Sequence, residues 1–146
     1  MAYNRVFCPL ILTVLSNQVN NMNNREKGNI GENIACDYLI NKGYLIIERN
    51  FLRKWGEIDI IAIKDNILNF FEVKSVIYKG IDNGHKPEDN VHEFKIKKLR
   101  RIVQTYLNEY KSKYSNEQKF KFHVISVKMD VLNDKNIIEM FEDLIL

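Results

Sequence analysis

Three strand-like segments follow one another closely in the middle of the chain, and they constrain the fold more than any other feature. Residues 44–51, 56–63 and 67–74 are rich in Ile and Phe, which favour strands. Short connections containing Arg-Lys-Trp and Lys-Asp-Asn separate them, residue types suited to turns. This close succession predicts an antiparallel meander.

Helical patterns lie on both sides of the meander. From Asn24 onward, apolar residues recur at helical spacing, and Gly43 is a stop signal just past the helix end. A second helix with one apolar stripe is predicted over residues 91–110. Residues 120–129 alternate as a strand, whereas residues 137–146 fit a short helix or an edge strand equally well. The order αβββαβ predicts a mixed α/β domain with helices on a central sheet.

The length of the chain, 146 residues, fits one domain. We expect residues 22–146 to form it, because Met22 stands just before the first helical pattern. Residues 1–21 do not share that pattern. We expect them to be an N-terminal extension that is disordered or arises from an upstream start.

Neither membrane insertion nor disulfide bonding is expected. The longest largely apolar run, Val6–Leu15, has ten residues and contains Pro9, whereas a membrane-spanning helix needs about 20. The two cysteines, Cys8 and Cys36, form no paired framework. The sequence therefore predicts a cytoplasmic protein with reduced thiols and no membrane contact.

The formal net charge of +3 conceals an uneven distribution. Residues 1–90 carry 11 basic and 11 acidic side chains, residues 91–128 carry 10 and 3, and residues 129–146 carry 1 and 5. A concentrated positive segment is typical of a protein that binds a polyanion such as nucleic acid. A solvated basic helix face is an equally good explanation.

One predicted strand carries an acid and a base on a single face. Within residues 67–74, Phe70, Glu72 and Lys74 point to the same side because strand side chains alternate. Glu72 and Lys74 should lie roughly 7 Å apart, since each residue rises about 3.4 Å. A carboxylate and an ammonium at this spacing can flank a metal-bound water and a phosphate.

A second carboxylate, Asp59, interrupts the apolar run of the preceding strand. The turn at residues 64–66 can bring Asp59 near Glu72. Two such carboxylates repel each other unless a hard divalent cation such as Mg²⁺ neutralises them. The alternative is structural: both acids could form salt bridges with Lys74 at a strand end.

Each predicted helix adds one charged residue near its apolar side. Glu32 lies about 110° from the centre of the first apolar stripe, at the border between core and solvent. There it can reach a site beside the sheet. Lys95 lies about 40° from Leu99, within the second stripe. A surface glutamate and a snorkelling lysine are the simpler interpretations.

The other cations of the second helix point away from its apolar stripe, where they could contact a nucleic-acid backbone. They are Lys97, Lys98, Arg100 and Arg101. Weaker candidates are Trp55, which could stack on a base but more often packs in a tight turn, and His123. His123 has no ligand spacing and fits a core histidine better.

Several short motifs occur together in one order. They are Gly28-x-x-Gly31-Glu32-x-x-Ala35, Gly43-Tyr44, Glu48-Arg49-Asn50-Phe51, Gly56-Glu57-Ile58-Asp59-Ile60-Ile61-Ala62 and Phe71-Glu72-Val73-Lys74. Over residues 25–128 the chain thereby resembles the YraN-like family of uncharacterised bacterial proteins. That family is placed in the PD-(D/E)XK nuclease superfamily and is similar to archaeal Holliday-junction resolvases.

The resemblance implies a restriction-endonuclease-like α/β core, with a mixed central sheet flanked by helices. It implies that Asp59 and Glu72 hold Mg²⁺ or Mn²⁺, together with the carbonyl of Val73. Lys74 would then orient the attacking water and offset negative charge in the transition state. Glu32 would be a helix-borne catalytic acid that binds a second metal ion or its water.

The resemblance also assigns Lys95 a supporting role on the second helix. Three residues depart from the family pattern. Ser75-Val76 stand where the family favours Thr-Arg, which removes a possible phosphate contact, and His123 stands where it has an aspartate.

Three functions are therefore open. The first is a Mg²⁺-dependent nuclease that hydrolyses DNA phosphodiester bonds, on branched or single-stranded DNA. The second is a non-catalytic nucleic-acid-binding or DNA-repair accessory module, and the third is a structural partner protein. A homodimer is plausible, because resolving a two-fold branched substrate needs two sites.

Overall fold

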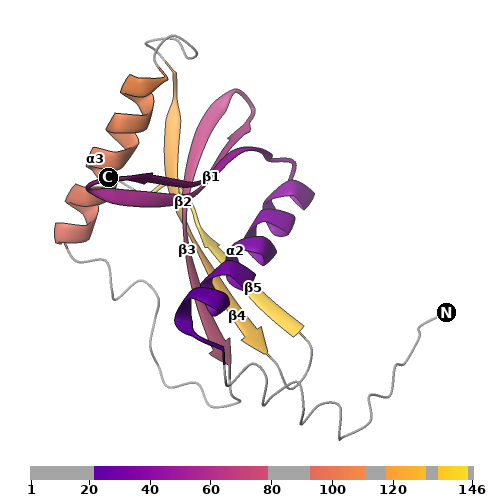
Figure 1. Cartoon of the computed structure of the whole chain (residues 1–146). Coiled ribbons are helices and arrows are strands. Elements are labelled where there is room, and N and C mark those ends of the chain that lie inside the picture. Colours follow the sequence, from indigo (N-terminus) through magenta and orange to yellow (C-terminus); the bar gives the residue numbers. More distant parts are fainter. Residues whose placement is uncertain (1–21, 79–92, 111–117, 131–134, 145–146) are drawn as a thin grey trace, which may run out of the picture.

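The protein is a mixed α/β domain in which two helices cover opposite faces of one five-stranded sheet (Figure 1). This computed structural model describes residues 22–78, 93–110, 118–130 and 135–144. The predicted N-terminal extension, residues 1–21, lies outside the described residues. Among those described, no helix is long and apolar enough to cross a membrane.

Helix α2, Asn24–Asn41, has a clear signal at each end. Asn23 Oδ1 accepts from the Glu26 N–H at 2.9 Å, and Glu26 Oε2 accepts from the Asn23 N–H at 2.8 Å. This capping box satisfies two backbone donors that the helix leaves unpaired. Gly43 follows with a φ of +85°, a left-handed conformation that glycine adopts without steric cost and that ends helices.

The predicted antiparallel meander is confirmed in strands β1 (Leu45–Arg53), β2 (Gly56–Lys64) and β3 (Ile67–Tyr78). Asp65 and Asn66 connect β2 to β3 with φ values of +51° and +61°. Two residues of positive φ form the hairpin turn whose twist matches the flanking strands. This turn fixes the register that places Asp59 and Glu72 at corresponding positions.

The end of β3 was predicted at Lys74, and this prediction was wrong. The strand continues to Tyr78, because strand β4 (Phe120–Asp130) runs parallel to it and pairs with every residue from Leu68 onward. The parallel pairing is made possible by the crossover through helix α3 (Glu93–Glu109). Lys74 therefore lies within β3.

The ambiguous C-terminal segment forms an edge strand, β5 (Lys135–Phe141), antiparallel to β4. The sheet order is β1-β2-β3-β4-β5. The face under α3 buries a cluster that includes Phe51, Phe70 and Tyr106. The face under α2 buries a second cluster that includes Leu39 and Phe71. Both clusters together hold the sheet between its two helices.

Candidate functional site

The candidate site lies where β2 and β3 separate. Their ladder ends at the pair Ile60–Phe71, and beyond this point β2 pairs with β1 while β3 pairs with β4. Asp59 and Glu72 are the next residues on the two strands. In Figure 1, strands β1 and β2 cross the long strands β3 and β4. The hairpin thus brings both predicted acids to one fork in the sheet.

Asp59 is only 8% exposed. Its Oδ2 accepts a 2.6 Å hydrogen bond from the Val73 N–H, a backbone donor that β2 no longer pairs at the fork. Burial, and after it the charges of Glu72 and Glu32, raise the pKa of Asp59 to about 7. The Val73 hydrogen bond and Lys74 lower this pKa, but by less. Burial is thus the main reason that Asp59 holds its proton, and the neighbouring carboxylates add to it.

Glu72 and Lys74 form an ion pair on the same face of β3. Lys74 Nζ donates to Glu72 Oε1, with 39% of the Lys74 side chain exposed and 11% of that of Glu72. This contact agrees with part of the structural alternative that the spacing left open. Asp59 differs, because its hydrogen bond goes to the Val73 backbone. The ion pair therefore places the Lys74 ammonium beside the Glu72 carboxylate at the fork.

Glu32 approaches the fork from α2. Its side chain is 16% exposed and its Oε2 lies 3.6 Å from Arg49 Nη2. That oxygen is buried and has no hydrogen-bond partner among the described residues. A buried carboxylate oxygen without a donor is costly. The position matches the predicted border between core and solvent, and the oxygen suits a water or cation ligand.

A close contact between α2 and β3 sets the place of Glu32. A Cβ atom at Gly31 would lie 1.7 Å from Ser75 Oγ, so only glycine lets the helix approach the strand this closely. Sequence reasoning missed this contact. The signal was a glycine inside a helical pattern, which is tolerated only for a reason of packing or function.

A metal site would have to rest on two carboxylates. Among the described residues, no three His, Cys, Asp or Glu side chains lie close enough together to hold a metal ion. Asp59 and Glu72, with the carbonyl of Val73 directly after Glu72 in the chain, supply the hard oxygen donors that Mg²⁺ prefers alongside water. The raised pKa of Asp59 fits such a cation, which would relieve the repulsion.

The four outward cations of α3 are all exposed, as their helical spacing predicted. The guanidinium of Arg101 lies 4.4 Å from the ring centroid of Trp55, and Trp55 Nε1 donates to Thr105 Oγ1 at 3.1 Å. Trp55 therefore anchors the β1–β2 turn to α3, in agreement with its packing interpretation. Lys95 lies in α3, but its side chain is outside the described residues, so its predicted inward direction stays a prediction.

His123 is a core histidine. Its Nε2 lies 2.9 Å from Asn69 Oδ1, and its Nδ1 accepts from the Asp143 N–H at 3.1 Å. Burial lowers the pKa of His123, so the ring is neutral at pH 7 with the proton on Nε2. This arrangement ties Asp143 to β4, and the His123 ring stacks on Phe71, the last β3 residue that pairs with β2 before the fork, with 4.8 Å between the ring centroids.

Ser126 is a site neighbour that sequence reasoning missed. It is the register partner of Lys74 on β4 and is 1% exposed. Its Oγ is buried and has no hydrogen-bond partner within the described residues. Because β4 is parallel to β3 across a distant crossover, no local pattern indicates that these two residues are adjacent.

The fold and the fork together define a small mixed α/β domain with two buried carboxylates and a lysine at one sheet junction, compatible with a nuclease-like core. Residues 31–127 match the family described as Uncharacterised protein family UPF0102, and the chain belongs to this family. This confirms the resemblance to the YraN-like proteins.

Three relatives illustrate the similarity, and each bears only the description UPF0102 protein. The relative from Helicobacter hepaticus is 44% identical over 90 residues, which is 62% of this chain and 76% of that protein. One from Clostridium botulinum strain 657 is 37% identical over 123 residues, covering 82% and 94%. One from Dictyoglomus thermophilum is 36% identical over 106 residues, covering 73% and 85%.

Proposed function

We propose that this protein is a Mg²⁺-dependent nuclease, also served by Mn²⁺, that hydrolyses phosphodiester bonds in branched or single-stranded DNA. The observation that carries the proposal is the fork where Asp59 and Glu72 meet, with Lys74 beside them. Burial and mutual repulsion raise the pKa of Asp59 there to about 7. A protein keeps such a repulsive pair more readily where it serves a function.

Each residue of the fork has a role in this proposal. Asp59, Glu72 and the Val73 carbonyl would hold the cation, which when bound supplies a water of lowered pKa and neutralises phosphate charge. Lys74 would orient the attacking water and offset charge on the phosphate oxygens. The buried oxygen of Glu32 would accept a hydrogen bond from a water on the α2 side.

The exposed side of α3 would hold the substrate. Its four outward cations lie in the segment with 10 basic and 3 acidic side chains. Phosphate contacts position a nucleic acid without reading its sequence. The proposed specificity therefore lies in DNA shape rather than in bases.

The test is cleavage of labelled four-way-junction, flap, single-stranded and duplex DNA with Mg²⁺ or Mn²⁺. We expect Glu72→Ala to lower the cleavage rate by about 100-fold or more, the usual cost of losing an electrostatic stabiliser in an active site. Glu57→Ala is the matched control, because Glu57 is an exposed acid on β2 outside the fork. Equal rates for wild type and Glu72→Ala, or no cleavage of any substrate, would refute the nuclease.

The second candidate is a nucleic-acid-binding or repair accessory module without turnover. The exposed cations of α3 favour it, since binding through them does not depend on the fork. The engagement of Lys74 with Glu72 also favours it. Salt-dependent DNA binding without cleavage would support this function, and a protein that neither binds nor cleaves DNA would exclude both.

A further inference from the structure

The two edges of the sheet differ in regularity. In β1 the ladder shifts register between Ile46 and Glu48, and Asn50 has a φ of +52°. Such irregularities discourage pairing of an edge with another chain. In β5 all seven residues pair with β4 in one unbroken register. In the described part of the chain no strand pairs with its outer edge.

The two faces of β5 are also distinct. Ile138 and Met140 pack toward α2, in the cluster on that face. Because side chains alternate, Lys135, Ile137 and Glu139 share the opposite face, where all three are exposed and Ile137 retains 43% of its accessible surface. The free edge thus presents an isoleucine flanked at equal distance by a cation and an anion.

This pattern is complementary to itself. If two β5 strands pair antiparallel about Ile137, Lys135 of each copy lies opposite Glu139 of the other, and Ile137 lies opposite its own counterpart. Opposite charges across neighbouring strands stabilise the pairing. Glu139 can pair with Lys135 of the other copy, because its ion pair with Lys128 in its own chain is long, at 4.0 Å. Moving the register by one or two residues removes both charge pairs.

We infer that the partner of this edge is a second copy of the chain, which pairs β5 with β5 and joins two sheets into one. The interface is isologous, with a two-fold axis through the Ile137 pair. Backbone hydrogen bonds supply affinity, as in other cases of strand addition. The charges at residues 135 and 139 set the register.

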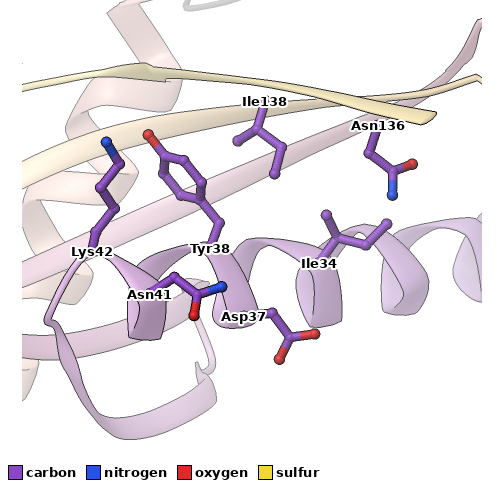
Figure 2. Close-up of a pocket in the computed structure, with 7 residues that line it drawn as sticks. All are labelled: Ile34, Asp37, Tyr38, Asn41, Lys42, Asn136 and Ile138. Carbon is purple, nitrogen blue, oxygen red and sulfur yellow. The ribbon is translucent and has the colours of Figure 1, made fainter. Parts of the chain in front are cut away.

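A hollow beside β5 belongs to the same interface. Figure 2 shows Ile34 and Tyr38 of α2 facing Asn136 and Ile138 of β5 across it. Its volume is about 370 Å³. In the proposed register, Asn136 of the second copy lies opposite Ile138, one of the residues that line this hollow.

Sedimentation of the full chain without nucleic acid tests the dimer independently of the proposed nuclease. We expect a particle of twice the 17.3 kDa chain mass. Lys135→Glu alone and Glu139→Lys alone each place like charges opposite one another and should raise the dimer dissociation constant about tenfold. The double exchange Lys135→Glu/Glu139→Lys restores both pairs and should return it to the wild-type value.

The matched control is Glu48→Lys, the same charge change on the opposite edge strand, which should leave the dissociation constant unchanged. Circular dichroism verifies that each variant is folded. A monomer at all concentrations overturns the inference. A dimer that ignores both single reversals overturns it as well, since another surface must then hold it.

A cross-link tests the register directly. Facing Cα atoms of an antiparallel pair lie about 4.5–5.5 Å apart, within the range of a disulfide. Oxidised Ile137→Cys should therefore form a covalent dimer, whereas oxidised wild type and Leu52→Cys, on the exposed β1 edge, should not. Cross-linking of Leu52→Cys to the same extent would contradict the assigned edge.

Discussion

Asp59→Asn should make the metal-free protein more stable at alkaline pH. The folded protein holds the pKa of Asp59 at about 7, against 3.8 for the ordinary residue. An acid whose pKa is higher in the folded state keeps its proton longer there than in the unfolded chain. Its stabilising contribution is therefore complete below pH 3.8 and is lost as the pH rises through 7.

The size of the effect follows from that difference. A tenfold change in an ionisation constant equals about 1.4 kcal/mol, so the full loss is about 4 kcal/mol at pH 8.5. Asparagine cannot ionise, and its amide oxygen can still accept from the Val73 N–H. Its amide nitrogen, however, needs a new partner. We therefore expect Asp59→Asn to exceed wild type by about 3 kcal/mol at pH 8.5.

Urea unfolding followed by circular dichroism, in EDTA at pH 4.5 and 8.5, measures this difference. The gap should nearly vanish at the lower pH. Asp37→Asn, at an exposed position on α2, is the control and should change the free energy of unfolding by less than about 0.5 kcal/mol at both pH values. A variant no more stable than wild type at pH 8.5, or a gap equal at both pH values, would refute the reasoning.

The same experiment tests the proposed cation without measuring activity. A ligand that binds only the folded state stabilises it. Adding Mg²⁺ at pH 8.5 should therefore raise the free energy of unfolding of wild type but not of Asp59→Asn. Equal responses of the two proteins would count against a cation held by Asp59.

Three further predictions concern other parts of the molecule. Gly31→Ala should destabilise the fold by about 2 kcal/mol, measured by urea unfolding, because its Cβ would meet Ser75 Oγ at 1.7 Å; Ser75→Gly should restore most of the stability, and an unchanged midpoint in Gly31→Ala would contradict the close approach. The contribution of His123 to stability should fall as the pH drops below 6.5, because burial lowers its pKa and the unfolded chain takes up the proton first; the free energy of unfolding of wild type relative to His123→Gln should therefore decrease between pH 6.5 and 5, and a difference that does not change with pH would exclude this effect. Replacing the exposed α3 cations by glutamine should reduce the salt dependence of DNA binding, with a change in the log–log slope of about 0.7–0.9 for each phosphate that the protein no longer neutralises; an unchanged slope in fluorescence anisotropy would place the DNA elsewhere. These cations are Lys97, Lys98, Arg100 and Arg101.

Local patterns were sufficient for most of the elements and for placing Asp59 near Glu72. The helical spacing that ends at Gly43, the turn predicted at residues 64–66 and the Ile- and Phe-rich strands depend on neighbours in the chain, so α2 and the β1–β2–β3 meander followed from the sequence. The sequence also indicated that the turn at residues 64–66 can bring Asp59 near Glu72, and the two-residue turn of the structure then fixes the register of the hairpin.

Interactions between segments distant in sequence were not visible in this way. The extension of β3 to Tyr78 depends on β4, which pairs with it only after the crossover through α3. The segment 137–146 became a strand because β4 offered it a free edge.

The sequence by itself determined which acids lie on neighbouring strands and which cations of α3 face solvent, because the periods of strand and helix place side chains without reference to the rest of the chain. Only the tertiary structure decided the chemical state of the site. The pKa of Asp59 depends on burial and on Glu32, which reaches the fork because Gly31 lets α2 approach Ser75. Desolvation and charge act through space, and the distances between elements arise only when the layers pack.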